Sequence, residues 1–345
     1  MSEIPLLEVK HLKKYYCSKN KSLLGKQEVK KSVNDVSFTV PKGKIFGLIG
    51  ESGSGKTTIG KTVLYLQKPT AGQVKFNNET IFDVENNIYI DTPRMNRLRK
   101  DMQLIFQDPL MSLDPRRTIF DILAIGVRKH RIVSGGEMEE YCGMILEQCG
   151  ISPDVMWRYP HQFSGGQRQR IGIARALAVK PEFIVCDEPT SALDVSVQSS
   201  VLNLLLELKE NLGLTYLFIS HNMDVVKHFC DEIAVMHKGR IVEQLAAKDF
   251  DNTKHHPYTQ SLLDALAVKY PWLRKPLSRS LGDSRLGDIC SSGTGCSFIQ
   301  ECPYANQACQ MAMPILQEVA PGHLIACHNY NDLVERECEH GRTQR

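Results

Sequence analysis

The chain has 345 residues, of which 42% are hydrophobic and 23% are charged, and its formal net charge is +3. This composition is ordinary for a globular protein, and the length suits one large domain followed by a smaller one. The nearly balanced charge gives no reason to expect a nucleic-acid partner or an anionic membrane surface.

The sequence predicts neither an export signal nor a membrane span. Its first residues lack the basic head and the long apolar run of a signal peptide. The most apolar stretch, residues 200–220, is interrupted by Glu207, Lys209 and Glu210. We therefore expect reduced thiols among the 11 cysteines. Four of them fall on apolar patterns that predict core positions: Cys142, Cys149, Cys186 and Cys230.

The amino-terminal part predicts a strand–loop–helix unit. Residues 6–16, LLEVKHLKKYY, alternate like an edge strand. A second strand then leads to a turn at Pro41–Gly43 and to an apolar strand at Ile45–Ile49. A glycine-rich loop follows, and a helix begins at Lys56.

The loop sequence GESGSGKT, residues 50–57, has two glycines separated by four residues and followed by Lys-Thr. Together with the strand before it and the helix after it, this spacing predicts a phosphate-binding loop. Glycines let backbone N–H groups turn toward phosphate oxygens, and the helix points its positive end at them. Lys56 adds a full charge, and the Thr57 hydroxyl is a hard oxygen donor suited to Mg²⁺.

Residues near 110–180 are richer in helical patterning, and a βαβ unit follows them. Phe183–Pro189 and Leu214–His221 are short apolar runs typical of buried parallel strands, and a helical pattern separates them. The first run ends in Asp187 and Glu188, one of which could hold a metal shell while the other faces a γ-phosphate and a water. The composition changes at residues 250–256, which predicts domains at 1–253 and 254–345.

Several further motifs resemble those of the ATP-binding-cassette (ABC) ATPases. In the family's order, the chain carries the phosphate loop, LIFQDP, FSGGQRQR, VCDEPTSALD and FISHN. The resemblance covers roughly residues 6–250. It implies an α/β fold: a P-loop NTPase, RecA-like core with an antiparallel β subdomain and an α-helical signature subdomain at about 108–180. The small cysteine-containing C-terminal extension follows this cassette.

The resemblance also implies a role for each motif residue. ATP and Mg²⁺ are the implied ligands, with Thr57, Gln107 and Asp187 toward the metal. Glu188 is the implied catalytic base, Gln107 the sensor of metal and water, and His221 the γ-phosphate clamp. Tyr16, or alternatively Tyr15, is the implied adenine-stacking aromatic. The implied ATP contacts are Gly50, Ser52, Gly53, Gly55, Lys56, Thr57, Thr58, Ser164, Gly165, Gly166, Gln167 and Asp194. The last five lie in motifs that face ATP bound to the opposite subunit of a head-to-tail dimer.

The segment KHHPYTQSLLDAL, residues 254–266, and the later ECPYANQAC and APGHLIAC resemble the tail of oligopeptide and dipeptide importer ATPases. The phosphate-loop region looks more like the second, F-type ATPase of such importers. This implies two membrane permease subunits, a second non-identical ATPase and, indirectly, an extracytoplasmic peptide-binding protein. The implied location is the cytoplasmic face of the cell membrane. The related alternatives are a nickel or other small-solute importer and a non-transport ABC ATPase.

Four cysteines near the end have an unusual spacing. Cys296, Cys302, Cys309 and Cys327 are separated by five, six and seventeen residues. This is neither a common zinc ribbon nor a tight ferredoxin run. Some members of the importer branch carry a 4Fe–4S cluster on cysteines of this layout. The open alternatives are a Zn²⁺ site and four thiols without metal, with Cys290 as a substitute ligand or bystander.

Overall fold

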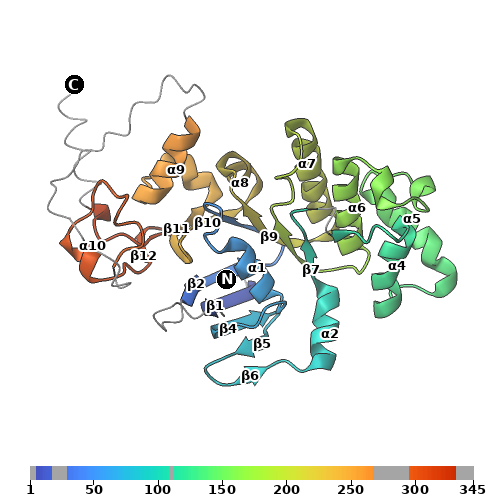
Figure 1. Ribbon diagram of the computed structural model, residues 1–345, viewed down its shortest axis with the longest axis horizontal. Coiled ribbons are helices and arrows are strands. Elements are labelled where there is room, and N and C mark those ends of the chain that lie inside the picture. Colours follow the sequence, from blue (N-terminus) through green and yellow to red (C-terminus); the bar gives the residue numbers. More distant parts are fainter. Residues whose placement is uncertain (1–4, 18–28, 109–111, 268–294, 332–345) are drawn as a thin grey trace, which may run out of the picture.

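This computed structural model describes residues 5–17, 29–108, 112–267 and 295–331. It contains two sheets with helices at both ends of the longer one (Figure 1). The strands are β1(Pro5–Cys17), β2(Val29–Pro41), β3(Ile45–Ile49), β4(Ala71–Phe76), β5(Glu79–Asp83), β6(Ile88–Tyr89), β7(Met102–Ile105), β8(Phe183–Asp187), β9(Thr215–Ser220), β10(Glu232–His237), β11(Arg240–Ala246), β12(Gln317–Ala320) and β13(His323–Ile325).

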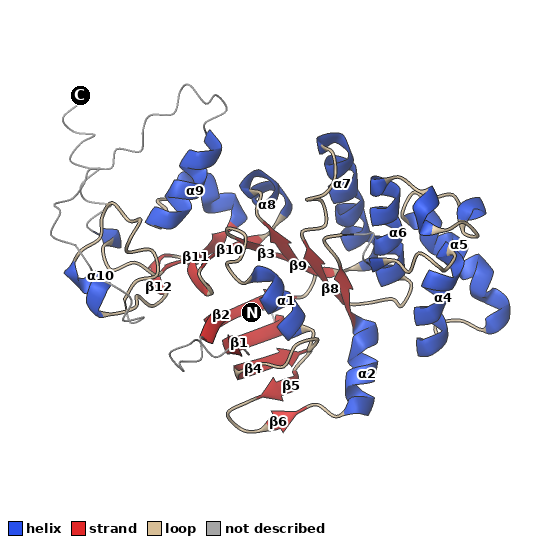
Figure 2. Cartoon of the chain, in the orientation of Figure 1, coloured by secondary structure: helices blue, strands red, loops and turns tan. Residues whose placement is uncertain are grey.

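The helices follow the periodic segments of the sequence. The α-helices are α1(Lys56–Val63), α2(Thr92–Asp101), α4(Ile119–His130), α5(Met138–Gln148), α6(Gly165–Leu177), α7(Val195–Leu212), α8(Met223–Phe229), α9(Pro257–Ala267) and α10(Gln307–Met311). Helices α4 to α7 gather beyond one end of the longer sheet, whereas α9 and α10 lie at its other end (Figure 2).

The longer sheet has the strand order β12-β13-β11-β10-β3-β9-β8-β7. Five consecutive strands, from β10 through β3, β9 and β8 to β7 at the edge, are parallel neighbours. Strands β3 and β8 are buried along their whole length, as expected for parallel strands covered on both faces. Helix α7 connects β8 to β9, so the predicted βαβ unit is confirmed.

The shorter sheet is antiparallel, with the order β2-β1-β4-β5-β6. The prediction of an edge strand at residues 6–16 was wrong, because β1 pairs with β2 on one side and with β4 on the other. The alternation in β1 arises from burial of one face: Leu7, Val9 and Leu12 are fully buried. Helix α1 packs between the two sheets and shares their apolar core.

The described C-terminal residues join the longer sheet through β13, which pairs with β11. Beneath this junction lies the buried carboxylate Glu243. It accepts hydrogen bonds from the His256 backbone N–H at 3.0 Å and lies 2.8 Å from His255 Nδ1 and from His323 Nε2. Burial opposes ionisation of Glu243, but the hydrogen bonds from the two histidines outweigh it and lower its pKa to about 2.

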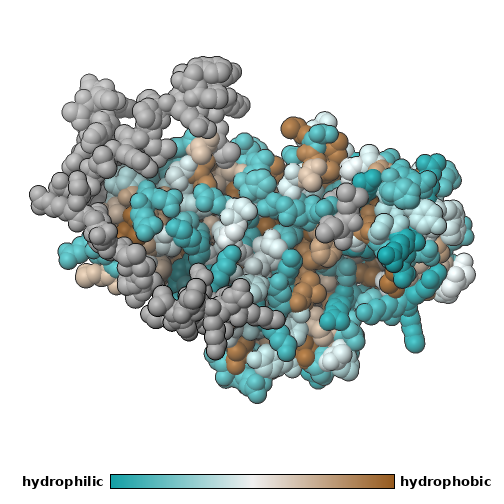
Figure 3. All heavy atoms as spheres, viewed as in Figure 1, coloured by the Kyte–Doolittle hydropathy of each residue, from teal (hydrophilic) through white to brown (hydrophobic). Residues whose placement is uncertain are grey.

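Among the described residues, no helix combines the length and the apolar character needed to span a membrane. The face in Figure 3 is mostly hydrophilic, with separate apolar patches of the kind that ordinary protein surfaces carry. The four cysteines predicted as core are buried: Cys142, Cys149, Cys186 and Cys230.

Candidate nucleotide site

The loop between β3 and α1 can follow its path only because it contains glycines. Gly50, Gly53 and Gly55 have φ angles of 154°, 84° and 110°, which side-chain-bearing residues rarely adopt. A Cβ atom on Gly50 would lie 2.2 Å from the Met236 carbonyl oxygen, and one on Gly55 would lie 2.1 Å from that of Ser32. Neighbouring backbone therefore holds both ends of the loop.

Lys56 begins α1 and lies under this loop. Its Nζ donates hydrogen bonds to the carbonyl oxygens of Gly50, at 2.7 Å, and of Glu51, at 2.9 Å. Burial lowers the pKa of Lys56, and the carboxylates of Glu188, Asp187 and Glu51 oppose that shift. A buried cation beside a helix N-terminus forms a strong binding site for an anion.

The two carboxylates that follow β8 differ in position. Asp187 is the last residue of the strand and accepts a hydrogen bond from the Thr57 hydroxyl at 2.8 Å. Burial raises the pKa of Asp187. The hydroxyl and the carboxylate are the oxygen donors that Mg²⁺ prefers. Glu188 has a φ angle of 47°, in the left-handed region, so the extended backbone of β8 ends at Asp187.

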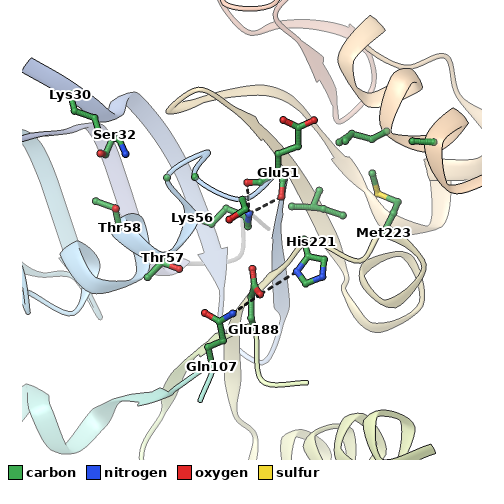
Figure 4. A pocket seen from close by; sticks show the side chains of 17 residues that line it. Lys30, Ser32, Glu51, Lys56, Thr57, Thr58, Gln107, Glu188, His221 and Met223 are labelled. Atoms are coloured by element: carbon green, nitrogen blue, oxygen red, sulfur yellow. Dashed lines mark hydrogen bonds and ion pairs between the residues drawn. The ribbon is translucent and has the colours of Figure 1, made fainter. Parts of the chain in front are cut away.

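The Glu188 carboxylate contacts two of the predicted residues, Gln107 and His221. Its Oε2 accepts a hydrogen bond from Gln107 Nε2 at 3.1 Å and lies 3.1 Å from His221 Nδ1 (Figure 4). The three side chains follow the C-terminal ends of β7, β8 and β9, which are adjacent parallel strands. Ligands of open α/β sheets bind at this edge. The His221 side chain is 55% exposed and that of Glu188 only 14%, so the histidine faces outward over the carboxylate.

These residues line one cavity of about 620 Å³. The predicted residues that line it are Gly50, Ser52, Gly53, Gly55, Lys56, Thr57, Thr58, Gln107, Glu188 and His221. The lining residues to which the sequence analysis gave no role are Lys30, Ser32, Ile49, Glu51, Met223, Leu262 and Ala265. Leu262 and Ala265 belong to α9, and nothing in the helical pattern of that segment indicates a role at the phosphate loop.

Tyr16 lies beside this cavity rather than in its wall. It pairs across the β1–β2 ladder with Lys30, which lines the cavity, and paired residues project on the same face of a sheet. Tyr16 is 37% exposed, and Lys14 Nζ lies 4.8 Å from the centre of its ring. Tyr15 pairs with Lys31, so it projects on the other face, where its hydroxyl lies 2.7 Å from Asn34.

The predicted signature residues lie apart from the cavity, at the start of α6 (Figure 2). Ser164 caps this helix: its hydroxyl accepts from the Gln167 backbone N–H, while the Gln167 side chain accepts from the Ser164 N–H. A Cβ atom on Gly166 would lie 2.5 Å from Val197 Cγ1, so α6 packs closely on α7. Asp194 is the N-cap residue of α7 and is also outside the cavity lining.

The four C-terminal cysteines lie close together. Burial raises the pKa of Cys302 and of Cys327 to about 11, and the neighbouring thiols of the group add to both shifts. The Cys296 N–H donates to the Cys309 carbonyl at 2.8 Å. Within the described ranges, no three His, Cys, Asp or Glu side chains are arranged to hold a metal ion. Cys290 lies outside those ranges.

Two sequence profiles match the chain. One, described as ABC transporter, matches residues 33–191, and the other, described as oligopeptide/dipeptide transporter, C-terminal region, matches residues 242–309. A putative peptide import ATP-binding protein of Brucella ovis is 45% identical over 327 residues, which cover 95% of this chain and 98% of that protein. The oligopeptide transport ATP-binding proteins AppF and OppF of Bacillus subtilis are each 40% identical, over 94% and 93% of this chain and 98% and 96% of their own lengths.

Solved structures show the same architecture. A dimeric ATP-binding cassette in a post-hydrolysis state, bound to ADP and Pi, is 28% identical, with a TM-score of 0.60 over 70% of this chain and 98% of that chain. A cassette from the Clostridium perfringens ABC transporter complex cbiONQ, at 24% identity, also has a TM-score of 0.60, over 79% of this chain and 96% of that one. The predicted fold class is thereby confirmed.

Proposed function

This chain belongs to the ATP-binding-cassette transporter family, and we propose that it hydrolyses ATP to energise an importer of oligopeptides or dipeptides. The observation that carries the proposal is the meeting of Lys56, Gln107, Glu188 and His221 around one cavity at the C-terminal edge of a parallel sheet. The match to the C-terminal region of oligopeptide/dipeptide transporters supports the peptide as cargo.

Each side chain of the cavity has a chemical task in this proposal. The loop amides and Lys56 hold the β- and γ-phosphates, and Thr57, Asp187 and Gln107 lie where Mg²⁺ would be held. The metal would neutralise charge on the phosphates. Glu188 orients and deprotonates the attacking water, and the imidazole of His221, 3.1 Å from its carboxylate, donates to the γ-phosphate. Tyr16 is the adenine-stacking residue, because it projects on the same face of the hairpin as Lys30.

The signature residues act on ATP bound by a partner cassette. The N-terminus of α6, an α-helix of 13 residues, favours an anion. Ser164 is its N-cap residue, and its first turn contains Gly165, Gly166 and Gln167. Their separation from the cavity of the same chain supports a head-to-tail dimer with two ATP molecules between the subunits. Asp194 would lie at this interface.

The family implies membrane permease subunits as partners. We propose that the assembly contains two membrane permease subunits and a second, non-identical ATPase. An extracytoplasmic peptide-binding protein would be an indirect partner. The chain would then act as a peripheral subunit at the cytoplasmic face of the membrane.

We also propose that Cys296, Cys302, Cys309 and Cys327 hold a 4Fe–4S cluster, with Zn²⁺ as the alternative. The chemistry of the donors supports the proposal, because four sulfur ligands suit either metal. The four side chains would have to rearrange around it, since no three of the described residues are arranged to hold a metal ion. Burial raises the pKa of Cys296, Cys302 and Cys327, so metal binding there must displace protons. Iron, sulfide and zinc assays on anaerobically purified protein test this: about four irons per chain support the cluster, and metal-free protein contradicts both.

The ATPase assignment is tested by Glu188→Gln. The variant keeps the shape of the side chain and its acceptor oxygen but loses the base. We expect ATP binding to persist and hydrolysis by the assembled transporter to fall by at least roughly a hundredfold. Full turnover at the altered sites would contradict the role of Glu188, and failure of the unaltered chain to bind ATP would contradict the proposal itself.

A further inference from the structure

The C-terminal segment reaches into the phosphate loop through one side chain. Tyr258 lies in the first turn of α9 and is only 1% exposed. Its hydroxyl oxygen accepts a hydrogen bond from the backbone N–H of Glu51 at 3.2 Å. The two residues are 207 positions apart in the sequence. Glu51 is the second residue of the loop, directly after Gly50.

The tyrosine ring is held from several sides, so the hydroxyl has little freedom to leave Glu51. Its centre lies 4.4 Å from that of His237 and 5.4 Å from that of Phe298, which meets it edge-on. The Tyr258 backbone N–H donates to His256 Nδ1 at 3.0 Å. Phe298 stands between Cys296 and Cys302, so the cysteine segment forms part of this support.

The Glu51 backbone matters because Lys56 and the loop both depend on it. The Glu51 carbonyl oxygen accepts from Lys56 Nζ at 2.9 Å and from the Ser54 N–H at 3.1 Å. A hydrogen bond to the N–H of Glu51 therefore orients the residue whose carbonyl directs the lysine. The same loop is held at its far side by the Gly239 N–H, which donates to the Ser54 carbonyl at 2.8 Å.

We propose that Tyr258 is a positioning residue of the nucleotide site, which holds the phosphate loop in its binding shape through the Glu51 amide. Tyr258 thereby contributes to ATP affinity without lining the cavity itself. This inference rests on the proposed function, since it concerns how the same loop binds phosphates.

The test compares Tyr258→Phe with Tyr330→Phe in the full-length chain. The first keeps the ring and its packing and removes the acceptor. The second removes a tyrosine hydroxyl of the same extension that bonds the Lys254 carbonyl, at 3.2 Å, instead of the loop. Binding of the non-hydrolysable analogue AMP-PNP with Mg²⁺ is measured by calorimetry. We expect about fivefold weaker binding for Tyr258→Phe, the usual size for one neutral hydrogen bond, and unchanged binding for Tyr330→Phe.

Hydrogen exchange separates positioning from general destabilisation. In Tyr258→Phe, exchange should rise in the peptide covering residues 50–58 and stay unchanged in β8. Unaltered AMP-PNP affinity and loop exchange in a folded Tyr258→Phe protein would overturn the inference, whereas an original chain that fails to bind AMP-PNP would overturn the proposed function.

A second variant tests the same hydrogen bond from the side of the loop. Glu51→Pro removes the N–H donor from the loop side. If both changes act on one hydrogen bond, Tyr258→Phe has no further effect on AMP-PNP affinity in the Glu51→Pro background. Effects that multiply would refute the pairing.

Discussion

Replacing Glu243 with glutamine should loosen the attachment of the C-terminal residues to the longer sheet. The carboxylate is fully buried and joins β11 to His255 before α9 and to His323 in β13. Glutamine has the same shape, but it carries no charge and places an N–H₂ group where an acceptor is needed. Both histidines then lose a charge-assisted partner.

The size of the effect follows from the pKa of Glu243. A decrease from 4.5 to about 2 corresponds, at about 1.36 kcal/mol for each pKa unit, to roughly 3 kcal/mol of stability in the ionised form. Because the pKa in the folded state is lowered, this stability is present above about pH 4.5 and is lost as the pH falls toward about 2. The variant lacks it at every pH.

Hydrogen exchange of β13 and of the first turn of α9 measures the local opening. At pH 7 the rate in Glu243→Gln should rise by roughly two orders of magnitude, with the same ratio to the original chain from pH 8 to pH 5. Glu232→Gln is the matched control, because this carboxylate of the same sheet bonds Gln244 Nε2, at 2.8 Å, rather than a histidine, and burial raises its pKa, so its charge adds no comparable stability. A ratio below about fivefold, or one that changes between pH 7 and pH 5, would refute the reasoning, because Glu243 stays ionised throughout that range.

Three further outcomes follow from the nucleotide site. Burial lowers the pKa of Lys56, and bound phosphates favour its charged form. ATP binding should therefore take up protons at alkaline pH and weaken as the pH rises. Calorimetry in buffers of different ionisation enthalpy measures this proton uptake. Gly60→Ala should lower the free energy of unfolding, measured by thermal unfolding, by about 1–3 kcal/mol, because the new Cβ would lie 2.8 Å from Val185 Cγ1. Gly172→Ala is the control and should be tolerated, because the nearest neighbour of its Cβ lies at 4.0 Å. Thr57→Val should abolish the gain in ATP affinity on adding Mg²⁺, while affinity measured in EDTA should change little.

Local signals in the sequence predicted the parts of the fold that depend on neighbouring residues. The turn after Pro41, the strand Ile45–Ile49 and the helix from Lys56 follow from apolar runs and glycine spacing, and the structure has them. The edge position of residues 6–16 was wrong because β4 pairs with β1 from more than 50 residues away, and a strand's own pattern does not show how many partners it has.

The site was predictable in the same uneven way. Gln107, Glu188 and His221 could be named because LIFQDP, VCDEPTSALD and FISHN resemble motifs of the ABC ATPases, and the structure brings the three side chains together. The contact between Tyr258 and Glu51 carries no local signal: a buried tyrosine in an apolar helix looks like core until the chain is folded. The Glu243 cluster was missed for the same reason, because a single glutamate within a strand pattern ordinarily indicates an exposed position.

Lys56 already donates hydrogen bonds to two carbonyl oxygens of its own loop. Nucleotide binding through several phosphate oxygens must therefore exchange part of this bonding for hydrogen bonds to phosphate. Gly50 and Glu51 already use two of the three N–H donors of Lys56, so a first phosphate oxygen can take the third donor and any further one must replace a carbonyl partner. A ligand with one phosphate recovers only part of what the displaced carbonyls provided, whereas a di- or triphosphate recovers it through several oxygens at once. We therefore expect the loop to favour longer polyphosphate chains, which offer oxygens to Lys56 and to the loop amides at once, and inorganic phosphate to be a poor competitor.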